Sequence, residues 1–106
     1  MAFQGIINRK GVDWAKIRQK YPVGIKLECK VVVHLPFGIF LDIGDEEVIG
    51  IVAIIDFETG VADYPPENSI VTGVVIGYTD DVRNQVWISL NPKVISGKEL
   101  PVQLRR

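Results

Sequence analysis

The sequence has very few of the residues that build disulfides, metal centres and catalytic pairs. Its 106 residues include one cysteine, Cys29, and one histidine, His34. A lone cysteine excludes a disulfide or a cysteine metal site within the chain, and we expect Cys29 to be a small buried residue of a strand. The two side chains lie five positions apart in one expected strand, hence on opposite faces, which argues against a Cys/His couple. We expect His34 to be part-buried, with its ring hydrogen-bonded.

Long apolar runs and targeting signals are also missing. No apolar stretch reaches membrane-spanning length, and residues 1–5 lack the charged start and apolar middle of a signal peptide. We therefore expect a soluble, cytoplasmic protein. The glycines of residues 73–77 lie in an apolar strand without the Lys-Ser/Thr of a phosphate loop, and the carboxylates of residues 45–47 and 80–81 read as solvated turns. These absences predict a protein that is not an enzyme and that holds no cofactor and no metal.

Positive charge is absent from the middle of the chain. Residues 1–30 carry seven basic and two acidic side chains, a balance of +5, and residues 83–106 carry five basic and one acidic, a balance of +4. Residues 31–82 contain no Lys or Arg but ten acidic side chains. Because phosphate neutralisation supplies much of the affinity for nucleic acid, any electrostatic grip on a strand must come from the two ends.

The remaining pattern predicts strands. β-branched runs, period-2 alternation and turn signals predict five strands at residues 25–35, 39–43, 48–55, 70–78 and 85–90, with a long connection over residues 56–69. A helix over residues 12–21 precedes them, because Asp13 can cap it, Trp14, Ile17 and Tyr21 share one face, and Pro22 ends it. We expect Trp14 and Ile17 to pack on the barrel. The length suits one core.

We therefore predict an all-β fold, a five-stranded antiparallel OB-fold barrel with a short N-terminal helix. Its expected divisions are an N-terminal arm at residues 1–11, the barrel domain at residues 12–93 and a C-terminal tail at residues 94–106. The arm would be loosely held unless its apolar side chains dock on the barrel.

Two aromatic residues stand out at the corner between the first two strands. Pro36 and Gly38 bend the chain there, and inward packing of Ile39 and Leu41 would turn Phe40 outward with Phe37 near it. Two aromatic rings on the outside of a small barrel can stack unpaired bases.

The residues that carry this pattern resemble the S1 RNA-binding domain family. The resemblance rests on a Pro-Phe-Gly-Ile-Phe-Leu-Asp-Ile-Gly run at residues 36–44, with Gly24 and Gly50 at matching separations, and it spans Trp14 to Lys93. It implies a five-stranded barrel that binds single-stranded RNA through Phe37 and Phe40.

The chain departs from the family pattern at several ligand positions. Ala53 replaces the RNA-facing histidine, Ile55 replaces a serine, and Gln85 replaces an arginine. The family aspartate is matched by Asp80 or Asp81, and Arg83 in the same loop is the candidate substitute for the arginine.

Two functions from different classes follow. In the first, the protein is a single-stranded RNA-binding module in which Phe37 and Phe40 stack bases while Lys26, Lys30 and Arg83 hold phosphates. In the second, the same face, made apolar by Ala53 and Ile55, binds a protein partner, for example within a ribonucleoprotein assembly. The resemblance favours RNA; the missing histidine and arginine and the acidic middle favour the protein partner.

Overall fold

A computed structural model describes residues 12–79 and 84–100 of the chain. Its helices are α2 (Trp14–Lys20) and α3 (Pro92–Ile95), and two 3₁₀ turns, η1 (Ile54–Asp56) and η2 (Gly60–Asp63), lie in the connection between the third and fourth strands. The strands are β1 (Lys26–Leu35), β2 (Gly38–Asp42), β3 (Ile49–Ala53), β4 (Ile70–Tyr78) and β5 (Gln85–Ser89).

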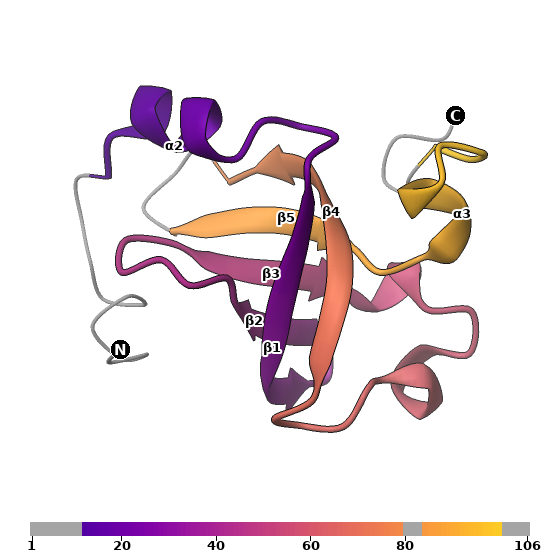
Figure 1. Ribbon diagram of the computed structural model, residues 1–106. Coiled ribbons are helices and arrows are strands. Elements are labelled where there is room, and N and C mark those ends of the chain that lie inside the picture. The colour runs from indigo at the N-terminus through magenta and orange to yellow at the C-terminus, as the bar shows by residue number, and fades with distance from the viewer. Residues whose placement is uncertain (1–11, 80–83, 101–106) are drawn as a thin grey trace.

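The five strands close into a barrel in the order β1-β2-β3-β5-β4 (Figure 1). The strand pairs are antiparallel except for β3 and β5, which run parallel and close the barrel through the pairs Ile49–Gln85 and Ile51–Trp87. Register shifts in β1 and β4 are the irregularities that let a small sheet curl on itself. The predicted all-β OB-fold is confirmed.

The barrel interior is filled by the inward side chains of alternating strand positions. Ile39 and Leu41 of β2 and Val86 and Ile88 of β5 are fully buried, and Cys29 lies among them as expected. Fully burying one such aliphatic side chain stabilises the fold by about 1.5–3 kcal/mol. The core therefore fixes which side chains of each strand face outward.

Helix α2 covers one end of the barrel, as predicted. The Asp13 side chain accepts a hydrogen bond from the Lys16 amide and caps the helix. Ile17 is buried, and Trp14 packs edge-on against Tyr78 with ring centroids 6.0 Å apart. The helix begins at Trp14, two residues later than the sequence suggested, because the cap residue precedes the first turn.

The connection between β3 and β4 differs from its prediction. Strand β3 ends at Ala53, because Ile54 already belongs to η1. The expectation that His34 is part-buried is wrong: the residue is exposed, although its ring is hydrogen-bonded to the Pro65 carbonyl oxygen at 2.6 Å and packs edge-on against Tyr64. Tyr64 donates to the Leu35 carbonyl oxygen at 2.8 Å. The connection is thereby tied to the end of β1.

No helix among residues 12–79 and 84–100 is long and apolar enough to cross a membrane.

Val94 of α3 is buried. The boundary between the barrel domain and the tail at residue 93 stays a prediction.

Candidate nucleic-acid interface

Phe37 and Phe40 lie beside each other at the β1–β2 corner. Their ring centroids are 6.3 Å apart with an interplanar angle of 70°. Phe37 is 56% exposed and Phe40 is half-buried. We call these two residues the stacking pair. Both rings lie outside the core, so the sequence placed them correctly.

Gly38 makes this corner possible. A Cβ atom at this position would collide with the backbone carbonyl oxygen of Val52 on β3. Only glycine therefore lets β2 approach β3 so closely between the two rings. The neighbouring residue Ala53, which pairs with Gly38 in the register, holds the position where the family resemblance would place a histidine. No side chain longer than a methyl group stands there.

An outward row of side chains continues from Phe40 across β3 and β5. Phe40 pairs with Ile51, and Ile51 pairs with Trp87. Ile51 points away from the core, because its neighbour Val52 is fully buried inside, yet Ile51 is only 3% exposed between its two aromatic partners. We call Phe40, Ile51 and Trp87 the outer row. The rings of Phe40 and Trp87 extend the apolar surface that begins at Phe37.

Trp87 is the member of this surface that sequence reasoning missed. The period-2 alternation of β5 already turned it outward, but its nearness to Phe40 depends on the parallel pairing of β3 with β5, which the sequence does not reveal. The indole Nε1 donates to the Thr79 hydroxyl at 2.8 Å, and Thr79 also donates to the Gln85 side chain at 3.3 Å. Gln85, at the family arginine position, is thus held by a neighbour.

The two candidate lysines of β1 stand at different distances from the stacking pair. Lys30 pairs with Asp42, which is two residues from Phe40 on the same face of β2. Lys26 pairs with Val74 and lies four residues from Lys30 along β1, which is about 13 Å at the usual rise of a strand. Both lysines are exposed, and in the described part of the chain neither forms an ion pair. The register therefore places Lys30 nearer to Phe40 than Lys26.

The other three candidates, Asp80, Asp81 and Arg83, lie outside the described residues, and their roles stay predictions. The two residues that flank their loop are described. The Thr79 amide donates to the Gln85 carbonyl oxygen at 3.0 Å, and the Asn84 carbonyl oxygen accepts from the Ile49 amide at 2.8 Å. Both ends of the loop are therefore anchored next to β3 and β5.

The expectation that Asp45 lies in a solvated turn is wrong. Asp45 is 5% exposed, and its carboxylate accepts hydrogen bonds from Lys20 Nζ at 2.9 Å, Tyr21 Oη at 2.7 Å and the Glu47 amide at 2.7 Å. Burial alone would raise the pKa of the Asp45 carboxyl, but these hydrogen bonds and the Lys20 charge hold that pKa below its ordinary value. Burial, with Asp45 beside it, raises the pKa of Tyr21. The hydrogen bonds of Asp45 therefore join α2 to the β2–β3 turn.

Metal ligation finds no support among the described side chains: no group of three or more His, Cys, Asp or Glu residues within residues 12–79 and 84–100 could hold a metal ion.

The arrangement of strands can be compared with solved structures. It is similar to the solution structure of GSP13 from Bacillus subtilis, with a TM-score of 0.57 and 20% identity over 81% of this chain and 65% of that one. It is also similar to a multidomain protein with nucleic acid binding domains from Streptococcus pneumoniae TIGR4, with a TM-score of 0.52 and 14% identity over 77% of this chain and 29% of that one. This chain thus spans less than two thirds of either protein.

No family model and no curated protein sequence matches the chain. At identities of 20% and 14%, the structural similarity shows a shared OB-type fold and nothing finer.

Proposed function

We propose that this barrel is a single-stranded RNA-binding module of the S1 type, without catalytic activity, that works in the cytoplasm. The observation that carries the proposal is the stacking pair: two aromatic rings in contact on the outer face, one of them 56% exposed. Stacking on aromatic side chains is the usual way in which OB-folds hold unpaired bases. The nucleic acid binding domains of the structurally similar pneumococcal protein agree with it by analogy of fold.

In this proposal the RNA crosses β2 at Phe37 and Phe40. Lys30 lies nearer to that path than Lys26, and it would hold one phosphate. Asp80, Asp81 and Arg83 would contact the strand from the β4–β5 loop, with Arg83 in place of the arginine that Gln85 replaces. Lys26, farther along β1, would act only on a longer strand.

The test is a titration of fluorescent single-stranded RNA at two salt concentrations. Phe37→Ala should weaken binding by about 1–3 kcal/mol, the usual value of one stacked base. Lys30→Ala should weaken binding and reduce the slope of log affinity against log salt by about 0.7, the share of one phosphate on a single strand. Val23→Ala, at a side chain that is 61% exposed, is the matched control for Phe37. Equal affinities for wild type and Phe37→Ala would rule the proposal out.

A second function keeps the same face but gives it a protein partner. Its support is apolar exposure: Ile55 and Val61 in the adjoining connection are 52% and 56% exposed, and no polar side chain replaces the family histidine at Ala53. This reading predicts no measurable affinity for single strands at moderate salt. A Phe37/Phe40 double alanine variant would then fold normally but lose its partner.

A further inference from the structure

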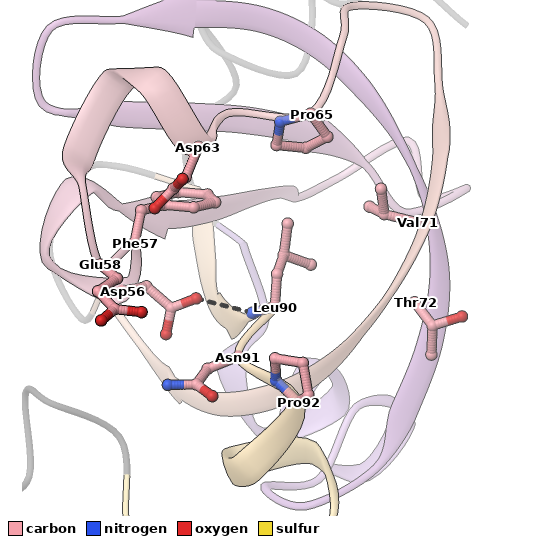
Figure 2. Close-up of a pocket in the computed structure, with 10 residues that line it drawn as sticks. All are labelled: Asp56, Phe57, Glu58, Asp63, Pro65, Val71, Thr72, Leu90, Asn91 and Pro92. Carbon is pink, nitrogen blue, oxygen red and sulfur yellow. Dashed lines mark hydrogen bonds between the residues drawn. The ribbon is translucent and has the colours of Figure 1, made fainter.

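A pocket of about 400 Å³ lies between the β3–β4 connection, β4 and the segment that follows β5 (Figure 2). It shares no residue with the stacking pair. Its walls are acidic on one side, where Asp56, Glu58 and Asp63 gather, and its remaining lining is mostly apolar. The apolar members are Phe57, Pro65, Val71, Leu90 and Pro92.

Among the described residues, no basic side chain forms an ion pair with the acids of this pocket. Residues 31–82 contain no Lys or Arg, and of the two described lysines that follow the pocket, Lys93 pairs with Glu99 at 3.6 Å and Lys98 is exposed. Asp56 is fixed in the wall, because its two carboxylate oxygens accept from the Ser89 hydroxyl at 2.6 Å and the Leu90 amide at 2.8 Å. Glu58 and Asp63 are exposed. Phosphate groups would be repelled here, and a cation would be attracted.

Strand β4 presents an open edge to the same pocket. Its pairing with β5 begins only at Val74, whereas its pairing with β1 extends back to Ile70. The Ser69 carbonyl oxygen and the Val75 amide both bond toward β1. Since alternate residues of an antiparallel strand direct their N–H and C=O groups to opposite sides, the backbone groups of Ile70 and Thr72 point away from β1, toward the pocket side.

We propose that this edge and pocket bind an extended segment of a protein partner that carries an arginine between apolar residues. The segment pairs with Ile70 and Thr72 as an added strand, and the arginine enters the pocket. Its guanidinium bonds Glu58 and Asp63, while its stem and plane lie on Phe57 and Leu90. An arginine suits this lining better than a lysine, because a flat guanidinium stacks on an aromatic ring and bonds carboxylates with paired N–H groups.

The experiment uses the full chain and the peptide fluorescein-Ser-Val-Arg-Val-Ser-amide, which carries its label on the N-terminal amine, and binding is followed by fluorescence polarisation. We expect saturable binding that falls at least about fivefold when arginine is replaced by citrulline, its neutral isostere, or when Glu58→Lys reverses the charge at the rim. Glu46→Lys, at an exposed acid of the β2–β3 turn outside the pocket, is the matched control and should leave the affinity unchanged. Equal losses in the two variants would overturn the proposal, as would equal binding of the citrulline peptide.

Strand addition is tested separately by the peptide backbone and by the protein amides. An N-methyl group removes the amide hydrogen that an added strand would donate to β4. Either the arginine or the two valines face β4 with their amides, so one peptide is N-methylated at the arginine and another at both valines. One of these two peptides must lose binding. In ¹⁵N spectra the Thr72 amide should shift on binding and the Phe40 amide should not. Binding of both methylated peptides, or shifts centred on Phe40, would refute the added strand.

The proposal does not depend on RNA binding, and the two are separable. Glu58→Lys should keep its RNA affinity, and Phe37→Ala should keep its peptide affinity. Displacement of the peptide by an RNA oligonucleotide, or a concentration-dependent dimer that Glu58→Lys abolishes, would show a different occupant and overturn it.

Discussion

Replacing Asp45 with alanine tests how the fold holds α2 against the β2–β3 turn. The carboxylate is 5% exposed and accepts three hydrogen bonds. Without it, the Tyr21 hydroxyl and the Glu47 amide lose their acceptor, at about 1–3 kcal/mol for each buried unsatisfied group. The Lys20 ammonium is exposed and regains water, so it adds little. We expect Asp45→Ala to lower the free energy of unfolding by about 3 kcal/mol.

Urea unfolding followed by the fluorescence of Trp14 and Trp87 measures this change. Tyr21→Phe, which removes one donor, should cost about 1 kcal/mol alone and less in the Asp45→Ala background, because its acceptor is then already gone. Glu46→Ala, an exposed neighbour, should stay within about 0.5 kcal/mol of wild type. An Asp45→Ala variant as stable as Glu46→Ala would refute the reasoning.

The difference in unfolding free energy between wild type and Asp45→Ala should depend on pH in a defined direction. Since the pKa of Asp45 is lower in the folded state than in the unfolded state, its contribution is complete above the unfolded value of about 3.9 and is lost as pH falls through the lower folded value. Wild type and Asp45→Ala should therefore differ equally at pH 7 and pH 5 and converge below about pH 4. A difference that persists unchanged at the acid limit would show that packing, not the carboxylate, is responsible.

Two further predictions concern the barrel itself. Gly38→Ala should destabilise the protein by about 3 kcal/mol, because the new methyl group meets the Val52 carbonyl oxygen, whereas Gly77→Ala, with open space around its Cβ, should be nearly neutral in the same urea titration. The Cys29 thiol should react with Ellman's reagent far more slowly in the native protein than in urea, because burial raises its pKa to about 12 and it is 2% exposed; stoichiometric labelling of the native protein within seconds would contradict this.

Local signals in the sequence predicted most of the barrel. Strand β4 begins and ends where alternation and turn residues placed it, at Ile70 and Tyr78. Phe40 points outward as expected, because Ile39 and Leu41 on either side of it are buried and the side-chain period of a strand follows from backbone geometry alone. These features depend on neighbours within a few residues, which is why a single sequence carries them.

Features that depend on distant parts of the chain could not be predicted in this way. Asp45 meets Lys20 and Tyr21 across 25 and 24 positions, so its local composition, an acidic turn, gave the wrong environment. The nearness of Trp87 to Phe40 needs the parallel pairing of β3 with β5. The sequence also could not rank Lys26 and Lys30, because their distances from the stacking pair follow from the register of β1 against β2.

The acidic middle of the sequence has a different meaning in three dimensions. The Asp45 carboxylate is hydrogen-bonded to Lys20 of α2, and Asp56 is buried and hydrogen-bonded to Ser89 at the end of β5. Glu58 and Asp63 line the pocket. Asp42 lies two positions from Phe40 on β2, and Lys30 of β1 pairs with it. Because four of the ten acidic side chains of the middle segment lie in the interior or at the pocket, the net charge of the segment is no measure of the charge at the stacking pair, and the acids of the pocket favour a cationic segment there.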